Sequence, residues 1–391
     1  MKVFATILLI VVVLLAAFVG LAVWKPVIAS RILWPVVENA MLRDPFVGIT
    51  TTGRLESGLF AVEATGVSTR PVVDAANALI DSLSNEQRVR LLHPVDDLEW
   101  RRWANIHIST RRGVGLLEMN AEQESAAMDL LAASLSARGL ETSRNIMRLE
   151  GHLADLKDDH DQYGEKRYWL TIMGEPSQTE PWGWQIDGHH LIINYFVLGD
   201  QVVMTPTFMG SEPTRADSGR FAGTVILEEE LAAGLALINT LDAKQRAKAI
   251  VSADKTANNN RGELFQDNAV VPYAGIGLSE LIGPQRELAV QLIMLHVGNM
   301  DAGHAQIKLA EVADHWDETR FAWVGDTAPD SVFYYRVHGP TLMIEYDHQT
   351  PVALDGPDVP SRNHVHTVVR TPNGNDYGKD LLGQHLELHP H

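Results

Sequence analysis

The sequence predicts an α+β fold made of two similar copies of one helix-then-antiparallel-strand unit, related by a pseudo-twofold axis and preceded by one transmembrane helix. The first observation is an internal repeat: three segments of the first half return in the second half in the same order, at offsets of 158, 151 and 166 residues. The matched pairs are residues 78–83 with 236–241, 184–195 with 335–346, and 202–206 with 368–372. Three matches in one order indicate a unit that folds twice.

The second observation is the amino-terminal segment 3–24, which contains no charged residue. A helix needs about 20 apolar residues to cross a bilayer, so we expect an uncleaved, single-pass anchor in the cell membrane. Lys2 lies before this segment and Lys25 and Arg31 lie after it, so the positive-inside rule hardly discriminates between the two orientations. We expect the main domain on the periplasmic or other extracytoplasmic side. A cleaved signal peptide and a buried core helix are the alternatives.

These signals divide the chain into four parts. The expected parts are an anchor at residues 1–25, a connecting segment at 26–69, a first repeat at 70–225, and a second repeat at 226–391 that carries most of the site. Turn signals at residues 50–53 and 57–58 suggest a small strand pair in the connecting segment.

Each copy is expected to begin with helices. A helix starts near Pro71, and Ser84 has the capping-box spacing to Gln87, which Asp242 and Gln245 repeat in the second copy. Further helices are expected at residues 121–137 and 284–297, and strands follow where aromatic and β-branched residues lie between Gly and Pro clusters. The expected strands are 168–173, 184–195 and 201–207 in the first copy, and 321–324, 333–346 and 364–371 in the second.

Composition excludes several classes of function. The 391 residues are 45% hydrophobic, so the chain can bury a large core. Acidic residues outnumber basic ones 50 to 32, which argues against nucleic acid as a partner because phosphate binding needs clustered Lys and Arg. The absence of cysteine excludes disulfides, thiol nucleophiles and thiolate metal ligands.

Two histidines in the last expected strand suggest a metal site. His364 and His366 are two residues apart, and side chains alternate across a strand, so both imidazoles project from one face. Two adjacent imidazoles can bind a divalent metal, for which zinc and iron are the candidates. A pair of hydrogen-bonded strand histidines without a metal is the alternative.

The repeat adds further candidate ligands. At offset 151, Asn194 corresponds to Glu345, so His190 and Glu345 share the same strand parity and are expected to face a common pocket. His189 has the opposite parity and is as readily a core histidine as a fifth metal ligand. At offset 166 the second copy has histidine or arginine where the first copy has other residues, as expected if only one copy of a duplicated scaffold retained a functional site. The replacements are His364 for Leu198, His366 for Asp200 and Arg370 for Met204.

Three further residues are candidates for catalysis. Arg370 shares the parity of His366 and could direct its guanidinium at an anionic substrate or at Glu345, with a surface ion pair as the alternative. Asp376 lies where the N-cap of the last helix is expected, with metal or substrate binding as the other interpretation. His385 lies on that helix and could reach back to the site.

Taken together, the motifs resemble an uncharacterised family, domain of unknown function 3500, over nearly everything after Thr69. The motifs that carry the resemblance are Trp182-Gly183-Trp184, Gly188-His189-His190, Tyr334-Tyr335-Arg336, Ile344-Glu345-Tyr346-Asp347, His364-Val365-His366, and Asn375-Asp376-Tyr377-Gly378 with His385. The resemblance implies recurrent histidine pairs and the acidic strand, and it implies no activity.

Two classes of function follow from these candidates. The first is a membrane-anchored, metal-dependent enzyme that acts on a small-molecule substrate, either by hydrolysis through a metal-bound water or by oxygen chemistry with iron. The second is a membrane-tethered binding or scaffold protein without catalysis. The chain lacks a Gly-rich phosphate loop and an H-E-x-x-H motif, so a standard nucleotide enzyme or zinc peptidase is not expected.

Overall fold

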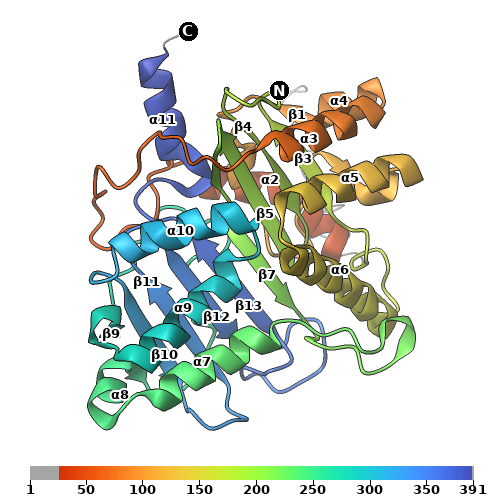
Figure 1. Cartoon of the computed structure of the whole chain (residues 1–391). Coiled ribbons are helices and arrows are strands. Elements are labelled where there is room, and N and C mark those ends of the chain that lie inside the picture. Colours follow the sequence, from red (N-terminus) through yellow and green to blue (C-terminus); the bar gives the residue numbers. More distant parts are fainter. Residues whose placement is uncertain (1–25, 390–391) are drawn as a thin grey trace, which may run out of the picture.

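A single large sheet, covered by helices on one face, organises the protein (Figure 1). The computed structural model describes residues 26–389. The strands follow one another across the sheet in the order β1-β3-β4-β5-β7-β13-β12-β11-β10-β8, with β2 paired to β3, β6 to β5 and β9 to β10. Most neighbouring strands are antiparallel, so the architecture is mixed α+β, in agreement with the sequence analysis.

The elements of the first half recur in the second half in the same order. The first half contains helices α3 (Arg70–Ser82), α4 (Asn85–Leu91), α5 (Ala121–Ser134) and α6 (Ala137–Lys157), and strands β1 (Leu92–His93), β2 (Val114–Gly115), β3 (Trp169–Met173), β4 (Trp182–Asp187), β5 (Leu191–Leu198), β6 (Gln201–Val203) and β7 (Thr207–Ser211). The second half contains helices α7 (Glu228–Thr240), α8 (Ala243–Ala249), α9 (Gly283–Val297) and α10 (Ala302–Asp314), and strands β8 (Ile250–Ser252), β9 (Ile276–Gly277), β10 (Arg320–Gly325), β11 (Phe333–His338), β12 (Met343–His348) and β13 (Val365–Arg370). Helix α2 (Pro26–Met41) precedes both halves and α11 (Lys379–Leu388) follows them.

The two halves join at the centre of the sheet, where β7 pairs antiparallel with β13. Outward from this pair, β5, β4, β3 and β1 on one side correspond to β12, β11, β10 and β8 on the other. Antiparallel pairing of two equivalent strands is the arrangement that a twofold axis between them produces. Two short 3-10 helices also correspond: η2 (Leu116–Glu118) follows β2, and η4 (Leu278–Glu280) follows β9. The other 3-10 helices are η1 (Leu98–Arg101), η3 (Gly219–Phe221) and η5 (Asp376–Gly378).

Local sequence explains where the short helices begin. Ser84 Oγ accepts a hydrogen bond from the Gln87 backbone N–H at 3.3 Å, and Asp242 Oδ1 accepts one from Gln245 at 2.9 Å. Each glutamine side chain returns a bond to the backbone of the capping residue, so both capping boxes form as the sequence predicts.

The sheet separates two cores. Residues of β5 alternate between them, because Leu191 and Ile193 pack against the helices while Ile192 and Phe196 point to the opposite face. That opposite face, called the loop face below, is covered by η1, η5, α11 and long loops. The strand residues His366, Val368 and Arg370 lie on the loop face, since Val368 belongs to its core and side chains of one face are two residues apart.

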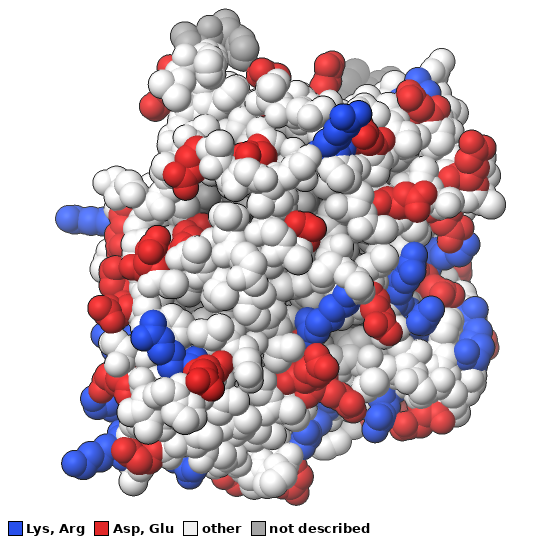
Figure 2. Space-filling model, in the orientation of Figure 1, with Lys and Arg blue, Asp and Glu red and all other residues white. Residues whose placement is uncertain are grey.

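The helix-covered face shows no broad area of one charge. Figure 2 shows acidic and basic side chains mixed over the face that carries α7, α9 and α10, with uncharged surface between them.

The expectation of a transmembrane helix is not supported. Within residues 26–389 no helix is both long and apolar enough to cross a membrane. The fold class is therefore corrected to α+β without a membrane-spanning element in this part of the chain, and the single-pass localisation with an extracytoplasmic domain loses its structural basis. The segment 3–24, from which that expectation came, lies outside the described residues.

Several element boundaries also differ from the expectations. The expected strand 184–195 is the hairpin of β4 and β5, with a turn at Gly188–His190, and 333–346 is the hairpin of β11 and β12. Helices α6 and α10 were not anticipated, because their polar faces obscure the apolar spacing. The small strand pair expected near residue 50 is reduced to one bridge, between Thr50 and Val270.

Strand register corrects the equivalence inferred at offset 166. Phe196 pairs with Val203, and its counterpart at offset 151, Asp347, pairs with His366. His366 therefore occupies the place of Val203 and not that of Asp200. The contrast between the copies remains, because an apolar side chain in the first copy corresponds to an imidazole in the second.

Candidate metal centre

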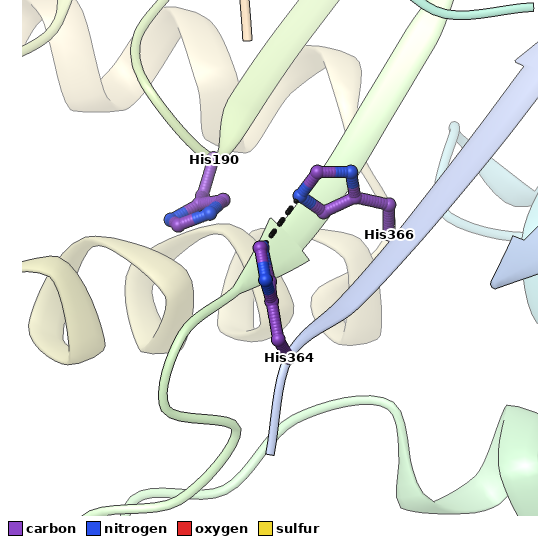
Figure 3. Close-up of side chains that lie close together, drawn as sticks. All are labelled: His190, His364 and His366. Atoms are coloured by element: carbon purple, nitrogen blue, oxygen red, sulfur yellow. Dashed lines mark hydrogen bonds between the residues drawn. The ribbon is translucent and has the colours of Figure 1, made fainter. Parts of the chain in front are cut away.

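Three histidines from the two halves meet at one end of the central strands (Figure 3). His190 immediately precedes β5, His364 immediately precedes β13, and His366 lies within β13. One ring nitrogen of each lies within 4.8 Å of those of the other two, and the Nε2 atoms of His364 and His366 are 2.9 Å apart. All three side chains are buried.

The pairing of β13 with β7 brings the two copies together at this point. Gly210 of β7 pairs with His366, and its backbone N–H donates to the carbonyl oxygen of His190 at 2.9 Å. A Cβ atom on Gly210 would lie 2.9 Å from Cδ2 of His366 and 3.5 Å from Cδ2 of His190. The absence of a side chain there leaves room for the imidazoles. Sequence analysis missed this residue, although glycine within a strand signals close approach of other groups.

His364 is held in a defined tautomer. Its Nδ1 lies 2.8 Å from the carbonyl oxygen of Thr350, which can only accept, so Nδ1 carries the proton. Burial lowers the pKa of His364 well below its usual value, and the neighbouring His366 and His190 lower it further. The ring is therefore neutral, with a free lone pair on Nε2. Glu212 Oε2 lies 3.5 Å from the same Nδ1.

Glutamates orient the other two imidazoles. His190 Nδ1 lies 2.9 Å from Glu150 Oε2, and His366 Nδ1 lies 2.7 Å from Glu263 Oε1. Burial opposes ionisation of both acids, but the adjacent histidines outweigh it and the pKa of each carboxyl is lowered. Ionised carboxylates only accept, so each Nδ1 donates, and the Nε2 of His366 lies against that of His364. The His190 Nε2 has no hydrogen-bond partner within the described residues.

His189 lies beside the three-histidine group and not within it. Its ring stacks on His190 with 3.8 Å between centroids, and its Nδ1 lies 2.8 Å from Glu150 Oε1. Burial, with His190 close by, lowers the pKa of His189 to about 3. Glu150, His189 and His190 form a second cluster close enough to bind an ion. Both oxygens of Glu150 already accept from the two rings, so this cluster supports His190 rather than competing with it.

Glu345 does not belong to the group, contrary to the sequence-based expectation. Glu345 lies on the same face of the sheet as His366, as strand alternation predicts. The register, however, pairs Glu345 with Val368 and places Asp347 opposite His366. The Glu345 carboxylate accepts from the Tyr334 hydroxyl at 2.6 Å and from the backbone N–H groups of residues 261 and 262 at 2.8–3.0 Å. Burial raises the pKa of this carboxyl.

Arg370 and Asp376 form a buried ion network instead of a catalytic pair. Arg370 Nη1 donates to Asp267 at 2.9 Å and to Asp376 at 3.2 Å, and all three side chains are buried. Asp376 accepts from the Thr371 backbone N–H at 2.7 Å, while Gly378 is the N-cap of α11, so Asp376 is not the expected helix cap. These contacts satisfy both acids internally.

His385 does not reach the site. It lies on α11 with its Nε2 at 3.4 Å from Glu180, and it belongs to neither histidine cluster. The candidate catalytic residues inferred from the sequence are therefore placed in supporting positions or outside the site.

The buried acids of β12 position the loop that carries Glu263. Glu345 accepts from the backbone of residues 261 and 262, and Asp347 accepts from residues 259 and 260 at 2.6 and 3.1 Å. Arg370 donates to the carbonyl oxygens of residues 262 and 263 at 2.8 and 3.1 Å. Glu345, Asp347 and Arg370 thus support the site through this loop. Glu150 and Glu263 were missed because they lie outside the strand motifs.

Comparison with known proteins identifies the family. The sequence profile described as Protein of unknown function (DUF3500) matches residues 65–379. The chain belongs to this family. The match covers both repeats and all three histidines, so the centre is part of the DUF3500 region and not of a separate appendage. No curated protein and no solved structure matches the chain.

Proposed function

We propose that His190, His364 and His366 bind one divalent metal ion, preferentially zinc, and that this DUF3500 protein is a metal-dependent hydrolytic enzyme for a small substrate. The observation that supports the proposal is the arrangement of the three rings. Each Nδ1 lies beside an oxygen, the Nε2 atoms of His364 and His366 are 2.9 Å apart, and a ring nitrogen of His190 lies within 4.8 Å of both rings.

The distances suit a shared ion. Two nitrogens bonded to one zinc at about 2.0–2.1 Å in tetrahedral geometry are about 3.3 Å apart, and the Nε2 atoms of His364 and His366, at 2.9 Å, need to separate only slightly to reach that distance. A metal ion bound by both Nε2 atoms would replace the hydrogen bond between them. Outer carboxylates and carbonyls bonded to the second ring nitrogen are the usual support for zinc-bound histidine.

The set of ligands favours zinc over iron. An iron oxygenase site typically uses two histidines and one carboxylate, and Glu345, the expected carboxylate, is engaged elsewhere. Three histidines with an open position are instead a known catalytic zinc arrangement, in which zinc lowers the pKa of a bound water to about 7. The protein's own contribution is to hold the three rings in one tautomer and to keep them buried.

Metal analysis tests the proposal. Full-length protein purified without a His tag, stripped with a chelator and reconstituted separately with zinc, iron, manganese and copper should retain close to one zinc per chain. His366→Ala and His190→Ala should lose the metal. His160→Ala changes an exposed histidine and His296→Ala a buried one outside the centre, so both should retain it.

Activity separates an enzyme from a scaffold. Hydrolysis of a panel of simple esters and phosphate esters should appear on adding zinc and be absent in His366→Ala. If no metal is retained under any of these conditions, the site is a set of hydrogen-bonded histidines and the non-catalytic binding or scaffold function replaces the proposal. If one zinc is bound but no substrate is hydrolysed, the metal site is confirmed and the proposed enzymatic activity is wrong.

A further inference from the structure

A cavity lined by arginines adjoins the metal centre. It has a volume of about 290 Å³ and is lined by Arg31 of α2, Arg111, Arg167 and His107, with Glu150 and His189 on the side of the centre. The cavity lies outside the three-histidine group, since neither His364 nor His366 lines it. It is therefore a separate candidate binding site, lined by arginines and not by the three histidines.

Positive charge in this cavity exceeds negative charge. Glu150 is the only carboxylate among the lining residues, and both of its oxygens accept from histidine rings. Arg111 lies 3.3 Å from Asp187, but its Nε makes no hydrogen bond of good geometry, and its side chain is 5% exposed. An ion pair with Asp187 accounts for the charge of Arg111 and leaves two other guanidinium groups.

Arg31 and Arg167 lack close carboxylate partners. Within residues 26–389 no carboxylate oxygen lies nearer than 4.0 Å to either guanidinium, and the one at that distance from Arg167 belongs to the fully exposed Asp161. Both donate only to backbone carbonyl oxygens, Arg31 to that of residue 161 at 3.2 Å and Arg167 to that of residue 160 at 2.6 and 2.8 Å.

The two guanidinium groups line one cavity and donate to the carbonyl oxygens of the adjacent residues 161 and 160. Burial lowers the pKa of Arg167, and the nearby charge of Arg31 lowers it further. Two like charges in one partly buried cavity are stabilised by an anion bound there, and arginine binds carboxylate and phosphate oxygens in paired hydrogen bonds.

We infer that this cavity binds a small oxyanion, a carboxylate or phosphate group, through Arg31 and Arg167. The inference does not depend on a metal at the three-histidine centre. The two sites share a wall, because Glu150 and His189 line the cavity while Glu150 also holds His190.

Titration with inorganic phosphate and with acetate tests the inference. Phosphate also binds metals, so the full-length protein is first stripped with a chelator, and His366→Ala serves as a second metal-free sample. Saturable binding of phosphate or acetate, followed by calorimetry, should occur in both samples with the same affinity. The anion that binds more tightly identifies the oxyanion class.

Matched arginine variants locate the binding. Arg167→Gln and Arg31→Gln should each weaken the anion affinity roughly ten- to hundredfold, as expected for loss of one charge-assisted pair. Arg215→Gln removes an exposed guanidinium outside the cavity and should leave the affinity unchanged. Modification of the unaltered protein by phenylglyoxal, mapped by mass spectrometry, should be slowed at Arg31 and Arg167 by the bound anion.

The inference is overturned if neither anion binds the metal-free protein saturably. It is also overturned if the Gln variants bind as tightly as the unaltered chain, or if the anion leaves modification of Arg31 and Arg167 unchanged. Binding that disappears in His366→Ala and in the stripped protein would assign the anion to a metal and not to this cavity.

Discussion

Gly210→Ala probes how closely the central strands pack around the three histidines. The added Cβ would lie 2.6 Å from the carbonyl oxygen of Val365 and 2.9 Å from Cδ2 of His366. Both distances are under 3.0 Å, a separation that Cβ atoms in proteins essentially never show. The carbonyl belongs to the backbone of β13 and cannot rotate away, so either the strand pair separates or the His366 ring moves.

The size of the effect follows from these distances. Overpacking of a filled core costs about 1–3 kcal/mol of unfolding free energy. Relieving the contact with His366 to an ordinary separation requires a shift on the order of 0.5 Å, which is also the tolerance within which a functional constellation must be held. We therefore expect Gly210→Ala to unfold at lower denaturant concentration and to bind zinc at least about tenfold more weakly, or 1.4 kcal/mol.

Denaturant unfolding and competitive zinc titration against a fluorescent chelator measure the two effects separately. Gly383→Ala on α11 is the control, because its Cβ would meet nothing within 4 Å. That variant should be as stable as the unaltered chain or more stable by roughly 0.5–1 kcal/mol, since alanine favours a helix more than glycine does. Equal stability and equal zinc affinity in Gly210→Ala would refute the reasoning about this strand pair.

Three further predictions concern the surrounding acids and bases. Glu263→Gln should reduce zinc affinity about 10- to 100-fold in competitive titration, because it removes the charge that supports His366 while leaving an acceptor oxygen. Arg370→Met should lower the unfolding free energy by about 3–5 kcal/mol, because it leaves the buried Asp376 without an ion partner, whereas Asp267 keeps Arg101. His338→Leu should flatten the acid dependence of stability: burial lowers the pKa of His338 to about 3, so the folded chain excludes a proton that the unfolded chain binds below about pH 6.5. The stability that His338 contributes above pH 6.5 is lost as the pH falls towards 3, by up to about 1.4 kcal/mol per pH unit.

Each of these predictions has a control or a contrary outcome. Glu287→Gln changes an exposed acid and should not alter zinc binding; a similar loss in both glutamate variants would point to a general charge effect. Folded Arg370→Met that keeps its stability but loses activity would restore a catalytic role for Arg370. If His338→Leu and the unaltered chain lose stability in parallel between pH 6.5 and 3, other buried groups dominate the acid response.

The repeat could be predicted because similar segments recur in the same order, and the helix caps could be predicted because they depend on neighbouring residues. The capping boxes of α4 and α8 need only residues three apart, and both form. The hairpin of β4 and β5 was expected as a single strand, since its short turn barely interrupts the aromatic and β-branched pattern. Helices α6 and α10 were missed for the opposite reason, that their exposed polar faces hide the buried spacing.

At the site, strand parity correctly brought His364, His366 and His190 to one face of the sheet. Parity fixes the face but not the position along the strand, which is why Glu345 was expected among the ligands although it lies two residue pairs along β12 from Asp347, the residue opposite His366. The ion network of Arg370 could not be foreseen, because its partner Asp267 lies more than 100 residues away in the chain. The oxygens that support the rings, from Glu150, Glu263 and Thr350, come from a helix and two loops that no strand pattern reaches.

The sequence by itself determined that the chain is a duplicated α+β protein of the DUF3500 family and that its histidine pair projects from one strand face, because repeats, caps and alternation are local properties. The tertiary structure alone decided that β7 and β13 join the two copies, which brings His190 of the first within reach of His364 and His366 of the second. It also decided which acids hold the imidazoles and which guanidinium groups remain without a carboxylate. Those relations depend on strand register and on packing between residues far apart in the chain, which local patterns do not encode.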